Sequence, residues 1–265
     1  MRPAFEAAGL KLVEIDWRAP LEDFADISLV LLGTAWDYQD HFGDFVAKLE
    51  ALEARGIRVC NPSQVVRWNG DKRYLKQLGD AGVTTIPTLW FDEVKSSDVA
   101  IALDAFEATR VVVKRQIGAG GLGQHSFGHD ALPQPGWRMG QPAMIQPFLP
   151  SVVEEGEYTF VFIDGEYSHG VLKRAAEGEY RIQSLYGGIE HAFEPQPEDL
   201  AQASAVFAAL PFDDMLYCRV DMARLPSGEL AVMEAEAIEP YLYPEQASDL
   251  GERMAAAVTR RLQSL

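Results

Sequence analysis

The chain has 265 residues, enough for one large domain or two or three smaller ones. Its 40 acidic and 23 basic residues give a net charge of −17, which argues against sequence-independent binding of nucleic acid or of an anionic membrane, because both need basic surfaces. Two distant cysteines and the lack of an apolar run long enough to cross a membrane are typical of a cytoplasmic protein.

The first 66 residues alternate between strand and helix patterns. We expect strands at 10–15, 27–32 and 57–60, with an amphipathic helix at 42–54. This spacing predicts a small parallel sheet with helices on its faces. A helix at 3–8 precedes the first strand, whereas such a sheet normally begins with a strand, so the usual first strand is expected to be missing. A misassigned start, a truncation or a strand from a partner chain would each explain this.

The next segment, to about residue 148, continues the alternation. A helix is expected at 71–79, because it begins beside a capping Asn or Asp and ends at Gly79, and a further helix is expected at 97–108. Strands are expected at 82–90, 110–114 and 143–149, the last running into a proline. This part is predicted to be a second α/β unit.

A glycine-rich loop, Gly118-Ala-Gly-Gly-Leu-Gly123, follows one of these strands. It lacks the Gly-Lys-Ser/Thr ending of a Walker loop, and Gln-His-Ser-Phe after it is a poor helix start for a dinucleotide fingerprint. A loop between strands can still cover phosphates with its backbone N–H groups, and Lys114 would add a positive charge. The alternative is a flexible hairpin loop with a surface lysine.

The last part, 149–265, mixes hairpins with helices. Strands at 158–163 and 168–174 are separated by a tight Asp-Gly turn. Helices are expected at 197–209 and 248–262. The order of elements over the whole chain favours a mixed α+β fold.

Near the C-terminus, Arg219-Val-Asp221 and Glu234-Ala-Glu236 lie on two expected strands joined by a Pro-Ser-Gly turn. Side chains two apart share a face of a strand, so each pair points one way and Cys218 points the other. Pairing the strands would gather three carboxylates and one guanidinium. Carboxylates that lie so close together repel one another unless a cation lies among them, and oxygen ligands suit Mg²⁺. The alternative is a solvated acidic hairpin.

Together these residues resemble the ATP-grasp superfamily of carboxylate–amine ligases, which includes glutathione synthetase, D-alanine–D-alanine ligase and a cycloserine synthetase-like branch. The similarity covers about residues 10 to 245 and rests on the order and spacing of the motifs. The segment from Glu236 to Pro240 points to the cycloserine synthetase-like branch. The resemblance implies an α/β pre-ATP-grasp, Rossmann-like domain at 1–66, a small lid subdomain at 67–148, and a C-terminal subdomain with the Mg/ATP site at 149–265.

The resemblance also implies ATP and Mg²⁺ as cofactors, with two ions expected. One difference concerns the metal ligands, because Glu236 stands where many members carry Asn; it keeps an oxygen ligand and adds a negative charge. By position, the implied roles are phosphate binding for Lys72, Lys114, Gly120 and Gly121, adenine binding for Gln146, Phe148 and Leu149, ribose binding for Glu157, catalysis for Lys173 and Arg219, and Mg²⁺ binding for Asp221, Glu234 and Glu236.

Substrate contacts are harder to predict. His169 is a candidate, although a histidine satisfied within a strand fits equally well. Arg181 and Gln183 share a strand face and could hold a substrate carboxylate, or could be ordinary exposed residues. Glu239 is interpreted either as a carboxylate behind the metal ligands or as the partner of a substrate amine. Core or subdomain contacts are expected for Trp17, Trp36 and Trp90.

The favoured function is an ATP- and Mg²⁺-dependent ligase that activates a small carboxylate as an acyl phosphate for attack by an amine, which can belong to the same molecule. An alternative is a regulatory module that binds ATP without turnover, and another is a kinase that releases a stable phosphorylated product. The expected partners are small-molecule substrates, without nucleic acid or membrane; a homodimer is left open.

Overall fold

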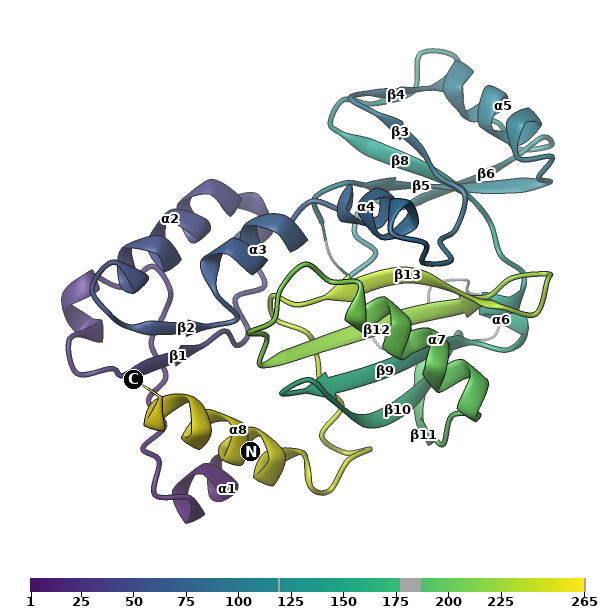
Figure 1. Cartoon of the computed structure of the whole chain (residues 1–265). Coiled ribbons are helices and arrows are strands. Elements are labelled where there is room, and N and C mark those ends of the chain that lie inside the picture. The colour runs from purple at the N-terminus through teal and green to yellow at the C-terminus, as the bar shows by residue number, and fades with distance from the viewer. Residues whose placement is uncertain (119, 177–186, 265) are drawn as a thin grey trace.

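The computed structural model describes residues 1–118, 120–176 and 187–264. Two antiparallel sheets form most of the α+β fold, and a two-stranded parallel sheet lies beside them (Figure 1). The larger sheet has the order β11-β10-β9-β12-β13. Its strands are β9 (Glu157–Ile163), β10 (Glu166–Arg174), β11 (Ile189–Phe193), β12 (Tyr217–Arg224) and β13 (Leu230–Glu236).

The two faces of the larger sheet are covered by different helices. On one face Phe160 and Phe162 share a core with α7 (Pro197–Ala208). On the other, Val161 and Ile163 share a core with α8 (Leu250–Gln263). This alternation follows from the two-residue period of a strand. Polar residues of β9 and β12 lie further along the face that α8 partly covers, so that end of the face is left to line a cavity.

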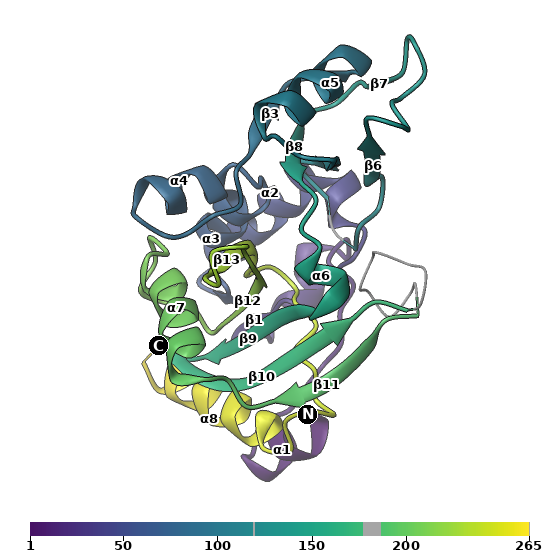
Figure 2. The ribbon, with the colours of Figure 1, turned by 90° about the vertical axis from the view of Figure 1, so that its right-hand side faces the viewer.

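The smaller sheet lies above the larger one in both ribbon views (Figures 1 and 2). Its strands, in the order β3-β8-β5-β6, enclose a core with helix α5 (Ser96–Ala105). Val111 and Val113 of β5 point into that core, because alternate residues share a face. The strands are β3 (Leu89–Phe91), β5 (Arg110–Arg115), β6 (His125–Gly128) and β8 (Ala143–Pro147), with the short pair β4 (Val94–Lys95) and β7 (Arg138–Met139) alongside.

The N-terminal region contains the predicted parallel pair, now β1 (Leu29–Leu31) and β2 (Arg58–Cys60), connected through α2 (Phe42–Glu53). The strand expected at 10–15 is wrong, because that segment forms no strand. Its leucines instead pack partly against the core beneath α8, beside α1 (Arg2–Ala7). The local pattern was apolar enough for a strand, but a strand also needs a neighbour with which to pair.

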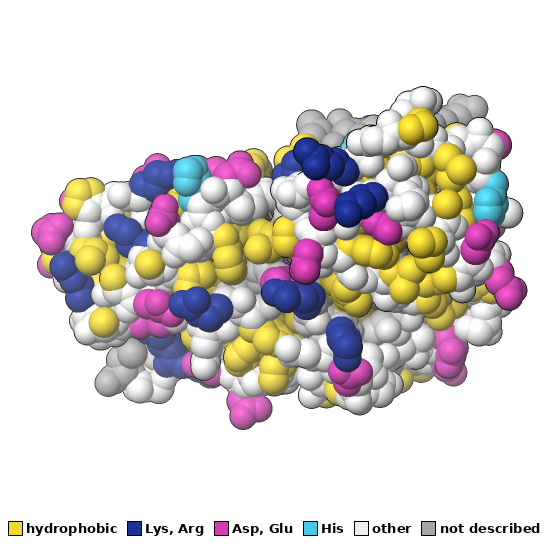
Figure 3. Space-filling view, turned by 90° about the horizontal axis from the view of Figure 1, so that it is seen from above, with side chains coloured by type: hydrophobic (Ala, Val, Ile, Leu, Met, Phe, Trp, Pro, Cys, Tyr) yellow, Lys and Arg dark blue, Asp and Glu magenta, His cyan; other side chains and the backbone are white. Residues whose placement is uncertain are grey.

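Shorter helices connect these parts. They are the 3₁₀ helices η1 (Leu21–Phe24) and η2 (Tyr38–Asp40), and the α-helices α3 (Ser63–Asn69), α4 (Tyr74–Asp80) and α6 (Ser151–Glu154). None of the helices in the described part of the chain is long and apolar enough to cross a membrane. Seen from above, basic and acidic side chains are interspersed, without a continuous basic surface on this face (Figure 3).

Candidate active site

The hairpin of β12 and β13 brings the predicted acids together. The strands pair antiparallel, with Arg219 opposite Glu236 and Asp221 opposite Glu234. This confirms the predicted pairing, and Cys218 points into the core on the other side of the sheet. The register shifts just after Asp221. Such an irregularity bends a strand and redirects its side chains, and here it lies next to the acids.

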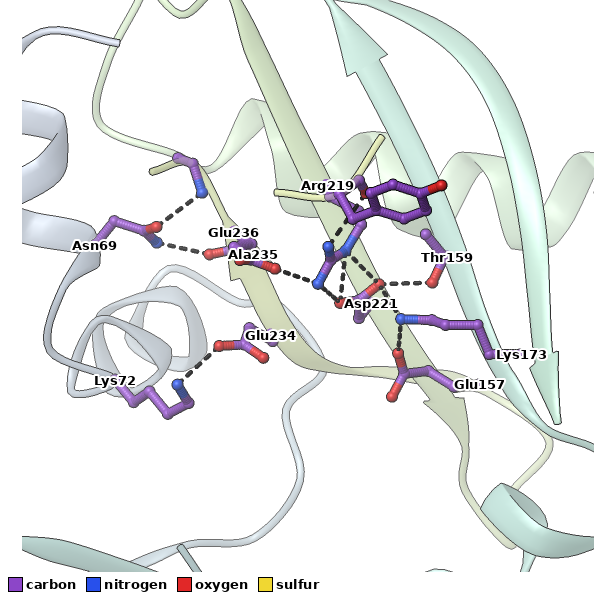
Figure 4. A network of polar contacts seen from close by, with 12 residues as sticks. Asn69, Lys72, Glu157, Thr159, Lys173, Arg219, Asp221, Glu234, Ala235 and Glu236 are labelled. Atoms are coloured by element: carbon purple, nitrogen blue, oxygen red, sulfur yellow. Dashed lines mark hydrogen bonds and ion pairs between the residues drawn. The ribbon is translucent and has the colours of Figure 1, made fainter. Parts of the chain in front are cut away.

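Asp221 lies at the centre of a buried network (Figure 4). It accepts hydrogen bonds from the Thr159 hydroxyl at 2.6 Å and from Nζ of Lys173 at 3.2 Å, and it pairs with Nη2 of Arg219 at 2.9 Å. Burial alone would raise the pKa of Asp221, but Arg219 and Lys173 outweigh burial and lower it. Asp221 is therefore held as an anion.

Lys173 and Arg219 are both buried cations between acids. Lys173 also pairs with Glu157, and Arg219 also pairs with Glu236. Burial opposes the charged form of each base, yet Asp221 and its neighbours raise the pKa of both. The two bases therefore remain charged on the face of the sheet that lines the cavity.

Lys72 joins the hairpin to the glycine loop. Its Nζ lies 2.7 Å from Oε1 of Glu234 and donates a hydrogen bond to the carbonyl oxygen of Gly118 at 2.6 Å. Burial tends to raise the pKa of Glu234, but Lys72 outweighs it, so the pKa is lowered. Lys72 therefore holds Glu234 of the hairpin and Gly118 of the glycine loop close together, although these residues are far apart in the sequence. The loop can then approach the acids.

Lys114 faces the same cavity but differs from the other bases. Within the described part of the chain it forms no hydrogen bond or ion pair, and burial lowers its pKa. Glu234 and Glu157 attract its ammonium group only from beyond ion-pair distance. An ammonium group placed in this way at a cavity is the complement of an anionic ligand. Gly120 and Gly121, which line the cavity beside it, have φ angles of +62° and +70°, a left-handed conformation that other residues adopt rarely.

The opposite side of the cavity includes the apolar residues Ile86, Val112 and Met144 and the buried polar residue Gln146. Gln146 is 2% exposed, and its amide nitrogen donates to Thr88 at 3.0 Å. Its Oε1 is buried and accepts no hydrogen bond from the described residues. The backbone N–H of Phe148 donates a hydrogen bond to the carbonyl oxygen of Arg110 at 2.9 Å. A planar ligand that carries an amino group would fit here, because it would supply the donor that Gln146 lacks.

These groups enclose one cavity of about 640 Å³ between the two antiparallel sheets. All of the cofactor, catalytic and metal candidates predicted from the sequence line it. The structure adds residues from the N-terminal region, from β5 and from the loop after β13, which the sequence patterns did not assign to the cavity. The added lining includes Trp36, Gln39, Arg115, Tyr241 and Tyr243, and Glu239, a candidate from the sequence, lines the cavity as well.

One described residue predicted to contact the substrate lies outside the cavity. His169 does not line the cavity, because its Nε2 lies 3.0 Å from the carbonyl oxygen of Leu242 and its Nδ1 lies 3.0 Å from Ser168. The interpretation of a histidine satisfied by its surroundings therefore fits better. Arg181 and Gln183 lie outside the described residues. Trp36 was expected in a core or subdomain contact, but it is 63% exposed and lines the cavity.

Two positioning residues had no role in the site assigned to them from the sequence. Thr159 orients Asp221 through its hydroxyl. Asn69, at the end of α3, donates to the carbonyl oxygen of Ala235 and accepts from the N–H of Ala237, so its amide holds the backbone on both sides of Glu236 (Figure 4). Both contacts join segments distant in the chain, and only the fold reveals them.

The arrangement suits a bound anion, and its acids have the chemistry of Mg²⁺ ligands. In the described ranges, no three acidic, histidine or cysteine side chains lie close enough to form a metal site as they stand. Glu234 and Glu236 instead face Lys72 and Arg219. Binding of Mg²⁺ would therefore require these carboxylates to exchange a basic partner for the ion, while phosphates take up the bases.

Glu239 is a buried carboxylate at the end of the cavity. Burial, reinforced by Glu236, raises its pKa to about 8. A group whose pKa is raised on folding contributes stability that is fully present below its unfolded pKa and is lost as the pH rises through the folded pKa. Glu239→Gln should therefore stabilise the ligand-free protein at pH 9, by roughly 2 kcal/mol, and have little effect at pH 5.

Urea unfolding at the two pH values measures this difference. Glu245→Gln makes the same chemical change at an exposed position of the same loop and should leave both values unchanged. A stabilisation by Glu239→Gln that is equal at pH 5 and pH 9 would contradict the burial of an ionisable carboxyl group at this position.

Comparisons with known proteins identify relatives of this chain. Residues 1–61 match the family model described as D-cycloserine synthetase DcsG, N-terminal domain. The cycloserine biosynthesis protein DcsG of Streptomyces lavendulae is 30% identical, over 99% of this chain and 93% of the relative. The crystal structure of D-cycloserine synthetase DcsG superposes with a TM-score of 0.82 at 26% identity, covering 98% of this chain and 92% of that one.

A more distant structure shares the fold. D-Alanine–D-alanine ligase from Bacillus anthracis complexed with ATP matches with a TM-score of 0.68 at 17% identity, over 99% of this chain and 90% of that one. The α+β architecture therefore recurs in a protein whose sequence has diverged widely.

Proposed function

Because the chain belongs to the DcsG-like ATP-grasp family of carboxylate–amine ligases, we propose that its cavity binds ATP with Mg²⁺ and activates a small carboxylate for closure onto an amine of the same molecule. The observation that carries the proposal is the placement of the β12–β13 acids opposite Lys72, Lys114 and the glycine loop in one cavity. We further propose the boundaries 1–66, 67–148 and 149–265 for its three parts.

Different residues of the cavity have different proposed roles in binding the nucleotide. Lys114 and Lys72 would neutralise phosphates, Gly120 and Gly121 would cover them, and Gln146 would accept a hydrogen bond from the adenine amino group. Glu157 would hold the ribose hydroxyls. When bound, ATP supplies the phosphoryl group that turns a carboxylate into an acyl phosphate, and Mg²⁺ offsets the charge of its phosphates. The metal ligands on this proposal are Asp221, Glu234 and Glu236.

Arg219 and Lys173 would stabilise the reacting end. Arg219 is a planar fork held by Asp221 and Glu236, and such a fork can bind two oxygens at once. It can therefore hold the substrate carboxylate and the transferring phosphoryl group in one geometry. Lys173 adds a second charge, fixed by Glu157. Positioning and charge neutralisation account for most of the rate acceleration in phosphoryl transfer.

Lys114→Met is expected to abolish stabilisation by Mg·ATP without harming the fold. In wild type, Mg·ATP at about 100 times its Kd should add about 2.7 kcal/mol and raise the melting temperature by about 5 °C, whereas NAD should not. The variant should be at least as stable as wild type without nucleotide, because it removes a buried cation whose burial outweighs the attraction of Glu234 and Glu157. Thermal unfolding with and without each nucleotide measures both effects.

Lys11→Met is the matched control, since Lys11 is exposed and is not among the residues that line the cavity. It should keep the full response to Mg·ATP. A wild-type protein that does not respond to Mg·ATP would refute the proposed function, and so would a Lys114→Met variant that responds normally. ADP release on addition of a substrate separates the ligase from a module that only binds nucleotide.

A further inference from the structure

Arg115 is a base of the cavity that has no role in the proposed function. The other basic side chains that line the cavity are Lys72, Lys114, Lys173 and Arg219. Three of these pair with acids, and the fourth, Lys114, is assigned to the phosphates. The guanidinium of Arg115 forms no ion pair with any described residue, although several carboxylates line the same cavity. It is therefore a positive charge that is left over at the cavity.

The glycine loop closes around the side chain of Arg115. Alternation along β5 would send Lys114 and Arg115 to opposite faces, but Arg115 is the last residue of that strand, and its side chain also lines the cavity. A Cβ atom on Gly118 would lie 3.4 Å from Cβ of Arg115, and one on Gly123 would lie 2.7 Å from its Nε. Both ends of the loop thus lie against Arg115, and a residue larger than glycine at Gly123 would displace its guanidinium.

This guanidinium contains a buried donor without an acceptor. Nε of Arg115 is buried and donates no hydrogen bond to the described residues. A guanidinium that only filled the loop would be expected to donate to the carbonyl oxygens around it, because a buried donor left unpaired is costly. Oε1 of Gln146 is the other buried polar atom of the described cavity lining that lacks a partner. Gln146 lacks a donor on the side proposed for the adenine, and Arg115 lacks an acceptor at the loop proposed to cover the phosphates.

We infer that Arg115 is a further nucleotide-binding residue, whose charge holds the glycine loop against the phosphates of the bound nucleotide. This inference rests on the proposed function and adds a residue that neither the sequence pattern nor the family resemblance assigned. A guanidinium donates several N–H groups in one plane, a geometry that matches phosphate oxygens. Lys72 holds only the Gly118 end of the loop, through its carbonyl oxygen, whereas Arg115 lies against both ends. A phosphate that accepts hydrogen bonds from Arg115 would therefore fix the whole loop.

The test compares ATP with adenosine, which has the same base and ribose but no phosphate. Titrations in the presence of Mg²⁺, followed by ligand-observed NMR, give both dissociation constants for wild type and for Arg115→Met. Methionine keeps an unbranched apolar stem against which the loop can pack, and it removes the charge. The affinity for Mg·ATP should fall about 10- to 100-fold, the loss expected for a charge-assisted hydrogen bond, whereas the affinity for adenosine should change less than about twofold. Arg115→Lys keeps the charge and should lose less affinity for Mg·ATP than Arg115→Met.

Hydrogen exchange tests the effect on the loop. Mg·ATP should slow the exchange of the backbone N–H groups of residues 120–124 in wild type, and adenosine should not. Arg115→Met should lose this protection even when it is saturated with Mg·ATP. Arg138→Met makes the same change at an exposed residue of β7 that does not line the cavity, and it should behave as wild type in both assays.

Three results would overturn the inference. Arg115→Met could bind Mg·ATP as tightly as wild type does. It could lose affinity for ATP and adenosine in equal proportion, which would show a structural role alone. The loop could also be protected equally in both proteins at saturation. A wild-type protein that does not bind Mg·ATP would instead defeat the proposed function.

Discussion

Arg219→Lys is expected to lower kcat about 100- to 1000-fold, the range for loss of a donor aimed at charge that develops in the transition state. Lysine keeps a positive charge beside Asp221 and Glu236, so the buried acids stay compensated and the protein should fold. It cannot bind two oxygens in the fixed plane that a guanidinium provides. The rate of ADP release under saturating Mg·ATP, with a substrate that gives turnover, measures the effect.

Arg224→Lys provides the control for this variant. Arg224 ends the same strand but pairs with Asp199 and Glu155 outside the cavity. The same chemical change there should leave kcat within about twofold and affect only stability. If kcat of Arg219→Lys falls less than tenfold while the response to Mg·ATP is kept, the role assigned to Arg219 is wrong.

Glu234→Gln is expected to remove the dependence of nucleotide binding on Mg²⁺ and to lower kcat by at least 100-fold, because a neutral amide is a weaker ligand for the ion. The ligand-free protein should lose about 1 to 3 kcal/mol at pH 7, since Lys72 loses its charged partner but keeps the carbonyl oxygen of Gly118. A Mg²⁺ titration at fixed ATP, followed by thermal unfolding, measures the first effect.

The stability loss of Glu234→Gln has a defined pH dependence. The folded pKa of Glu234 is lowered, so its contribution is present above the unfolded pKa and is lost as the pH falls through the folded pKa. The difference in unfolding free energy between variant and wild type should therefore become smaller as the pH falls. Glu229→Gln, exposed near the turn of the same hairpin, should show neither effect. Normal turnover by Glu234→Gln would refute the metal assignment.

The centre of the site could be predicted because its geometry is local. Arg219 and Asp221 share a face owing to the period of a strand, and the turn between β12 and β13 brings the second pair of acids opposite. The same period placed Cys218 in the core. The residue pattern also predicted the glycine loop and Lys114 as a phosphate site, family resemblance added Lys72 and Lys173, and the structure places all of them at the cavity.

The remaining features depend on contacts between distant segments. Asn69 holds the backbone beside Glu236 across more than 160 positions of the chain, and no local pattern encodes such a contact. Trp36 looked like a core residue by type, yet the cavity leaves it exposed. The strand expected at 10–15 had a suitable composition but no strand beside it. The local sequence pattern predicts which side chains share a face of a helix or strand. Contacts with distant segments of the fold determine whether that face is buried, paired or exposed.

A crystal structure with Mg²⁺ and a non-hydrolysable ATP analogue tests the central claim most directly. We expect the metal ion to contact Asp221 and Glu234, the phosphates to lie against Lys72 and Lys114, and the adenine amino group to face Oε1 of Gln146. A nucleotide bound outside this cavity, or phosphates that approach the β12–β13 acids without an intervening metal ion, would contradict the account.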